Sequence, residues 1–182
     1  RSGGVELRVH PTLIPAKRLI ANVEGAMNAV LVQGDAVGST LYYGKGAGAE
    51  PTASAVIADL VDVTRMHTAD PENRVPHLAF QPDQLSDLPV LPMAEVETSY
   101  YFRIRVEDKP GVLADITRIL ADEQISIDAL LQREPEEGEQ QTDVIILTHV
   151  TKEKRADAAI AKIEALAAVK GKVKRLRLET LS

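Results

Sequence analysis

The 182-residue chain contains no cysteine and no tryptophan, and aromatic residues make up only 3% of it. The lack of cysteine excludes thiol catalysis, disulfide bonds and cysteine-ligated metal. Positive charge is also scarce, because 21 Lys and Arg residues stand against 27 Asp and Glu residues, which gives a net charge of −6. This balance argues against nucleic acid or an anionic membrane as a partner.

Long hydrophobic stretches are missing as well. Apolar runs such as Val144–Leu147 are far too short to span a bilayer, and nothing at the N-terminus resembles a signal peptide. We therefore expect a cytoplasmic location. Hydrophobic residues make up 45% of the chain and charged residues 26%, which is ordinary for a globular protein, and the length allows one large or two small domains.

The first third of the chain has the pattern of a small sheet. Val5–His10 alternates apolar and polar residues and predicts a strand. Two more strands are predicted at Ala29–Gln33 and Thr40–Tyr43, and the turn residues between them favour an antiparallel hairpin. The chain enters its first strand abruptly and has no initiator Met, so we expect it to be part of a longer protein.

A glycine-rich turn follows this hairpin within Leu41–Leu60. Its three glycines are Gly44, Gly46 and Gly48. Glycine lets a backbone turn tightly and approach a ligand closely, and the next residues predict a helix over about Thr52–Met66, with Pro51 in its first turn. The free N–H groups of such a helix can face an anion. GxGxG is not the dinucleotide fingerprint GxGxxG, so taken alone the pattern favours a plain tight strand-to-helix turn over a ligand-binding loop.

Five of the ten prolines fall between Thr68 and Thr98, which predicts a linker without long regular structure. Its apolar residues suggest that it packs along a surface. These residues are Leu78, Phe80, Leu85, Leu88 and Leu91.

The remaining residues have the clearest periodicity in the chain. Alternating apolar residues predict strands at Tyr100–Val106, Ile125–Leu131, Thr142–Val150 and Val173–Leu178, and helical spacing predicts helices at Val112–Leu120 and Ala156–Ile163. The order is βαββαβ, a ferredoxin-like α+β arrangement. An RNA-recognition motif shares this fold. It is disfavoured here, because the third strand has no aromatic residue and the loop before it is acidic.

The sequence RIRVEDKPGVLADITRIL at Arg103–Leu120, followed by ISID at Ile125–Asp128, resembles the ACT domain, a sensor of small molecules in enzymes of amino-acid metabolism. Gly111 lets the following helix N-terminus approach an α-carboxylate, and Asp108 can pair with an ammonium group. The expected effector-binding residues are Asp108, Lys109, Pro110, Gly111, Val112, Leu113 and Ile127. A plain turn and helix cap is the alternative, since many ACT domains bind nothing.

The front half resembles the closing part of the catalytic region of bacterial homoserine dehydrogenase. The resemblance rests on VELRVHPTLIP (5–15), LIANVEGAMNAVLVQGDAVG (19–38) and YYGKGAGAEPTASAVIADL (42–60). It implies an oxidoreductase that interconverts aspartate 4-semialdehyde and L-homoserine with NADPH or NADH, on the branch to threonine and methionine. It also implies three parts: the tail of a mixed-sheet substrate and dimerisation domain (1–67), a linker (68–98) and an ACT regulatory domain (99–182).

The same resemblance assigns the glycine loop. It implies that Gly48 lies at the NADP or NAD cofactor, with Gly46, Ala47 and Glu50 beside it. It further implies threonine as the amino-acid effector and a homodimer or higher homo-oligomer.

Catalytic residues are not expected within this chain, because in this family the dinucleotide fingerprint and the acidic and lysine residues of the active site precede the matching segment. Lys17 and Lys45 are expected to be solvated. No metal site is expected, because the histidines are scattered along the sequence; they are His10, His67, His77 and His149.

A second hypothesis is a free-standing amino-acid-binding module without chemistry. The two hypotheses differ in what they predict for residues 1–66. An enzyme segment would expose apolar surface there, where a nucleotide domain sits, whereas a free-standing module would have a closed front domain with its own core.

Overall fold

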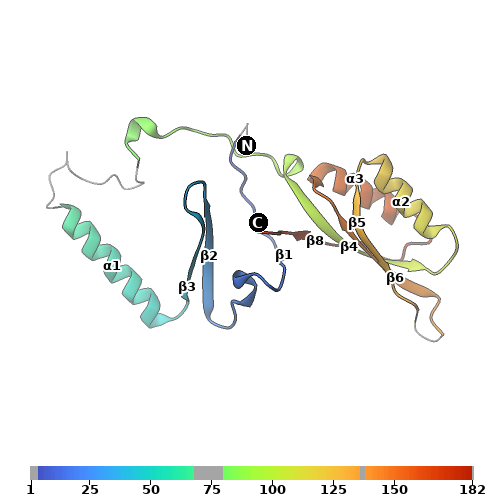
Figure 1. Ribbon diagram of the computed structural model, residues 1–182, viewed down its shortest axis with the longest axis horizontal. Helices are drawn as coiled ribbons and strands as arrows, with labels where there is room; N and C mark the ends of the chain where they lie inside the picture. The colour runs from blue at the N-terminus through green and yellow to red at the C-terminus, as the bar shows by residue number, and fades with distance from the viewer. Residues whose placement is uncertain (1–3, 68–79, 136–137, 182) are drawn as a thin grey trace. The chain divides into compact units, whose positions relative to one another are not determined.

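The computed structural model describes residues 4–67, 80–135 and 138–181 (Figure 1). The chain divides into two compact units. One unit combines Arg1–Pro15 with Leu88–Ser182, and the other consists of Ala16–Asp87. The first unit is therefore built from two stretches that lie far apart in the sequence.

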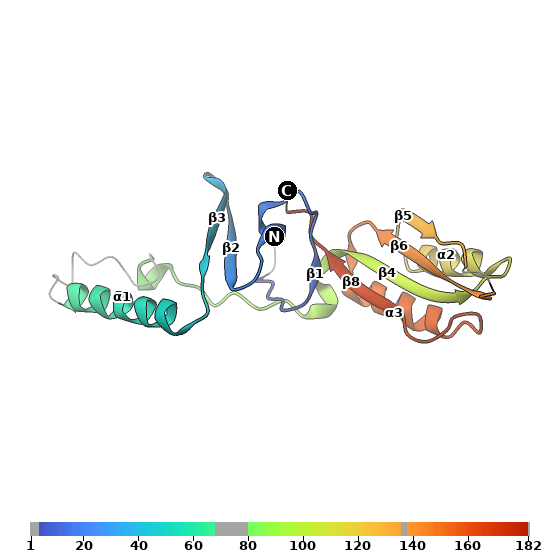
Figure 2. The same cartoon turned by 90° about the horizontal axis from the view of Figure 1, so that it is seen from below.

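The first unit is a mixed sheet with two helices. Its elements are β1 (Thr12–Leu13), β4 (Glu97–Glu107), α2 (Val112–Asp122), β5 (Ile127–Gln132), β6 (Gln141–Thr148), β7 (Thr151–Lys152), α3 (Glu153–Glu164) and β8 (Lys174–Leu178). The strand order is β1-β8-β4-β6-β5 (Figure 2). In addition, β7 pairs with β4. The βαββαβ prediction is confirmed, with β1 and β7 added to it.

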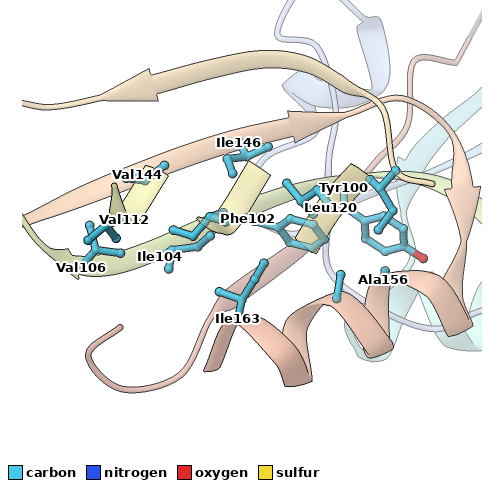
Figure 3. Close-up of a cluster of buried hydrophobic side chains, with 13 residues drawn as sticks. Tyr100, Phe102, Ile104, Val106, Val112, Leu120, Val144, Ile146, Ala156 and Ile163 are labelled. Carbon is cyan, nitrogen blue, oxygen red and sulfur yellow. The ribbon is translucent and has the colours of Figure 1, made fainter. Parts of the chain in front are cut away.

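One face of this sheet forms the hydrophobic core with both helices. Alternate residues of β4 point into it, and Tyr100, Phe102 and Ile104 have no exposed surface. Figure 3 shows Ala156 and Ile163 of α3 beside these side chains. Helix α2 adds three residues at helical spacing: Val112, Ile116 and Leu120. Burying one such aliphatic side chain contributes roughly 1.5–3 kcal/mol, so this layer stabilises the unit.

The opposite face of the sheet holds a groove of about 540 Å³. Most of its lining is apolar: Leu13, Ile14, Pro15, Tyr101, Ala129, Leu130, Leu131, Ile145, Leu147 and Leu178, with Glu179 and Thr180. Its position explains why β6 is apolar on both sides at Val144–Leu147. Val144 and Ile146 are buried under the helices, while Ile145 and Leu147 line the groove.

A charged group lies inside the core at the start of α3. The Glu153 carboxylate accepts hydrogen bonds from the Tyr100 hydroxyl at 2.6 Å and from two Arg177 nitrogens at 2.6 and 3.1 Å, and Arg175 lies 3.1 Å away. The Glu153 side chain is only 6% exposed. Burial alone would raise the pKa of Glu153, but the donors around it outweigh burial and lower that pKa. Burial, together with this carboxylate, raises the pKa of Tyr100.

The strand predicted at Val5–His10 is wrong. Only Val5 makes a β-bridge, with Val90, and the strand lies further on, where β1 pairs in parallel with Arg177–Leu178 of β8. The alternating pattern identifies an extended backbone but not its partner, and the free edge of β8 meets Thr12–Leu13 instead.

The apolar side of the Val5–His10 segment is its exposed side. Val9 is fully exposed, and Leu7 is 62% exposed. Arg8 is half-buried between two carboxylates, 2.7 Å from Glu6 and 3.0 Å from Glu179. Ion pairing therefore decides which side of this segment faces the sheet.

The second unit is an antiparallel hairpin followed by a long helix. Its elements are η1 (Leu19–Asn22), β2 (Met27–Gly34), β3 (Gly38–Lys45) and α1 (Ala49–His67). The predicted hairpin and helix are confirmed, although the helix begins at Ala49. None of the described residues of this unit is buried, and α1 exposes an apolar stripe that includes Val56, Ile57 and Leu60 at 52–59%. No described helix is long and apolar enough to cross a membrane.

The proline-rich segment contains two short 3-10 turns, η3 (Pro82–Gln84) and η4 (Met93–Glu95). Phe80, Leu85 and Leu88 are 52–62% exposed, so the expected packing along a surface is wrong for them. Leu91 is half-buried. Leu78 lies outside the described residues.

Candidate functional site

A cavity of about 420 Å³ lies where β4 ends and α2 begins. Asp108, Lys109, Pro110, Gly111, Val112 and Leu113 all line it, together with Val106, Glu107, Gln132 and Val144. The structure thus gathers six of the seven residues expected to bind an effector. The seventh, Ile127, lies on β5 outside this lining.

Gly111 shapes the opening of this cavity. It is the N-cap of α2 in the left-handed conformation, at φ +93°, which glycine adopts without strain. The Gly111 carbonyl accepts the first helical hydrogen bond, from the Asp115 N–H at 3.0 Å. The N–H groups of the first turn have no partner within a helix, so they and the helix dipole favour a carboxylate here. A Cβ on Gly111 would meet nothing within 4 Å.

Two neighbouring carboxylates at this cavity have different partners. Glu107 is held by Lys109 at 2.7 Å and by Lys170 at 2.8 Å, and hydrogen bonds from these ammonium groups lower the pKa of Glu107 to about 2. Asp108 instead accepts a hydrogen bond from the Gln132 side-chain amide at 3.1 Å. A neutral partner leaves the charge of Asp108 available to a ligand ammonium, while Glu107 is already neutralised.

Sequence reasoning missed Gln132, Glu107 and Lys170. Gln132 reaches the cavity from β5, 24 residues beyond Asp108, and a periodic pattern carries no sign of such a contact. Glu107 ends β4 and lies between the strand predicted at Tyr100–Val106 and Asp108, which is the one signal that could have identified it.

The glycine loop connects β3 directly to α1. Gly48 has φ +120°, and its carbonyl accepts a hydrogen bond from the Thr52 N–H at 3.2 Å. A Cβ on Gly46 would lie only 2.8 Å from the Asn28 amide nitrogen. Ala47 and Glu50 are exposed, as are both glycines. The strand–turn–helix geometry is confirmed, and the open backbone of this loop suits close approach of a ligand.

Lys17, Lys45 and the described histidines do not line the effector cavity. Lys17 and Lys45 are exposed, as predicted. His10 is hydrogen-bonded to Thr12 at 2.8 Å, and His77 lies outside the described residues. Among residues 4–67, 80–135 and 138–181, no three histidine or acidic side chains converge on a possible metal position.

Comparison with known proteins gives two matches to sequence families. The homoserine dehydrogenase family matches residues 2–61, and the ACT domain matches residues 100–168. Homoserine dehydrogenase of Pseudomonas aeruginosa is 60% identical over 179 residues, which cover 98% of this chain and 41% of that protein. That of Methylobacillus glycogenes is 64% identical over 98% of this chain and 42% of that protein.

A solved structure agrees with these relatives. The crystal structure of a homoserine dehydrogenase from Thiobacillus denitrificans is 71% identical, with a TM-score of 0.88, and the match covers all of this chain and 41% of that one. The chain therefore spans about two fifths of the length of its relatives.

Proposed function

Because this chain belongs to the homoserine dehydrogenase family, of which it represents the C-terminal part, we propose that it acts within a longer NAD(P)-dependent enzyme that interconverts aspartate 4-semialdehyde and L-homoserine. Within that enzyme, the ACT domain binds an amino acid that regulates turnover. The reaction belongs to threonine and methionine biosynthesis.

One observation favours this proposal over a free-standing amino-acid-binding module. The described residues of the second unit include none that is buried, and α1 and the hairpin expose large apolar side chains. An apolar surface of this extent marks an interaction site. We infer that the nucleotide-binding domain of the longer protein covers it, since a free-standing module would bury such residues in a core of its own.

The first expected result concerns activity. The 182-residue chain assayed with L-homoserine and NADP or NAD should show no cofactor-dependent turnover, because the hydride-carrying cofactor needs a binding domain that its relatives supply from other sequence. The longer enzyme, assayed in parallel, is the control. Turnover by the 182-residue chain alone would contradict the proposal that another part of the longer enzyme binds the cofactor.

We propose further that the glycine loop lies against the NADP or NAD cofactor, which supplies the hydride. Gly48, with Gly46, Ala47 and Glu50 beside it, would present open backbone to the dinucleotide. This fits the left-handed φ of Gly48 and the exposure of the loop. The role of these residues is to shape and bind; none of them moves a proton.

Gly48→Val in the longer enzyme should lower kcat/KM by about tenfold, because a branched side chain obstructs approach of the cofactor. Gly38→Val is the matched control, since Gly38 also has a positive φ, +76°, but is the first residue of β3, next to the hairpin turn and outside the glycine loop. Steady-state kinetics with varied cofactor would measure both variants. Equal effects of the two would show that the loop is only a turn.

For the ACT domain we propose threonine as the effector. Its α-carboxylate would accept hydrogen bonds from the N–H groups of Gly111 and Leu113 at the start of α2, and its ammonium would pair with Asp108. Within Lys109–Leu113, Pro110 has no N–H, and the Lys109 and Val112 N–H groups donate to the carbonyls of Glu107 and Lys109. Ile127 would contribute from β5 of the same chain or of a second one. The cavity, the left-handed Gly111 and the uncompensated Asp108 support this assignment.

We also propose that two chains associate, with two-fold symmetry. The apolar groove on the open face of the sheet and the outer edge of β5 are suited to this. Sedimentation should show a dimer at about 10 µM, because an interface of standard size persists at that concentration. Ile145→Glu, within the groove, should shift the protein to monomer, whereas Val150→Glu, which is exposed outside it, should not. A monomeric wild-type chain would contradict the proposal.

A further inference from the structure

The short strand β1 completes the ACT sheet with residues from the opposite end of the chain. Thr12 and Leu13 pair in parallel with Arg177 and Leu178 of β8, and the Glu179 N–H donates to the Leu13 carbonyl at 3.1 Å. Arg8 strengthens this junction through its 3.0 Å ion pair with Glu179. The outer edge of β8 is therefore closed by the same chain.

A second anchor holds the start of the segment. The Val5 N–H donates to the Pro89 carbonyl at 2.8 Å, and the Leu91 N–H donates to the Val5 carbonyl at 2.9 Å. Gly4 fits closely against this stretch, since a Cβ there would lie 2.3 Å from the Pro89 carbonyl oxygen. Residues 4–13 are thus fixed to the ACT unit at both ends, and the next residues lead into the second unit.

A continuous set of strand pairings joins this segment to the effector cavity. Val106 and Glu107, at the end of β4, line the cavity. The beginning of the same strand, Ser99–Arg103, pairs with β8, and β8 carries β1 on its other edge. Arg177 sits at the centre of this path, because it pairs with β1 and also binds the buried Glu153.

We propose that β1 couples the ACT sheet to residues 4–13, the stretch that leads into the second unit. A change at the effector cavity then alters the stability of the β1–β8 junction, and a change at that junction alters the cavity. Coupling between two sites is reciprocal, and hydrogen exchange measures it as local opening. The regulatory meaning of this coupling rests on the proposed function; the coupling itself does not.

The deciding experiment uses the 182-residue chain without ligand. Arg8→Gln removes the ion pair to Glu179 and should raise exchange about threefold at Thr12–Leu13 and at Lys174–Leu178, the change expected for one ion pair. It should also raise exchange at Val106–Leu113. Lys162→Gln is the matched control, because it breaks the 2.6 Å pair between Lys162 and Glu123, which involves neither β1 nor β8. Faster exchange at β1 and β8 with none at Val106–Leu113 would overturn the coupling.

A second arm adds L-threonine at millimolar concentration. Protection at Val106–Leu113 together with protection at Thr12–Leu13 supports both the effector proposal and the coupling. Protection at the cavity alone overturns the coupling and leaves the effector proposal standing. No protection anywhere contradicts threonine as the effector, and the ligand-free arm then decides the coupling alone.

Discussion

Replacing Glu153 with leucine should lower the free energy of unfolding by about 3 kcal/mol, because it leaves Arg177 and the Tyr100 hydroxyl without their acceptor inside the core. Tyr100→Phe, which removes one hydrogen bond to the same carboxylate, should cost about half as much. Glu95→Gln is the control, since Glu95 bridges the half-buried Lys152 and the exposed Lys154 and should matter far less. Denaturant unfolding of the three variants measures the differences.

The pH dependence of stability gives an independent check on Glu153. Its pKa is lowered in the folded state, so its contribution is fully present above the pKa of an unfolded glutamate and is lost as the pH falls through the lower folded value. Thermal unfolding from pH 7 to pH 3 should therefore show a shallower loss of stability for Glu153→Gln than for the wild type. Parallel curves, or an unchanged unfolding energy for Glu153→Leu, would show that the network contributes nothing.

Gly111→Asp should abolish threonine binding, with an affinity loss of at least about a hundredfold, equivalent to about 2.7 kcal/mol. The new carboxylate would lie at the N-cap of α2, next to the N–H groups and the helix dipole that would otherwise hold the carboxylate of the ligand. Open space around Gly111 lets the side chain fit without a clash. Calorimetry of the 182-residue chain measures the affinity, and in the longer enzyme the variant should escape threonine inhibition while keeping its uninhibited turnover.

Gly111→Asn is the matched control for this variant. Asparagine has nearly the same shape as aspartate and tolerates the left-handed conformation, but it carries no charge. It should weaken binding by no more than about tenfold, which separates charge repulsion from backbone strain. Wild-type affinity in Gly111→Asp, or no threonine binding by the wild-type chain, would mean that the cavity has another role.

The ACT half was predictable because its periodicity is strong and local. The alternation from Tyr100 to Val106 and the helical spacing from Val112 to Leu120 each describe one buried face. The glycine loop was predictable for a similar reason, since glycines and a proline specify a turn and a helix start within a few residues. In each case the signal lies within the element that it describes.

Features that join distant parts of the chain were not predictable in this way. The strand expected at Val5–His10 failed because its pattern says nothing of a partner, and the available edge, β8, lies more than 160 residues further on and pairs with Thr12–Leu13. The Glu153 network joins residues 53 and 24 positions apart. A signal for it does exist, because Arg175 and Arg177 alternate onto the face of β8 that meets the helices, where an acidic partner is needed. Glu153 pairs with both arginines, and Asp157 also pairs with Arg175.

Because the first unit is built from two separate stretches of the chain, residues 97–178 alone do not contain its complete sheet. The whole of Ala16–Asp87 is an insertion between β1 and the rest of the sheet. A graft of residues 97–178 onto another enzyme would carry the cavity and the core but would leave the edge of β8 bare and prone to aggregation. A graft that keeps both function and solubility therefore has to include residues 4–15. These residues can be added as a separate peptide, or they can be joined to the rest of the unit by a short loop that replaces Ala16–Asp87.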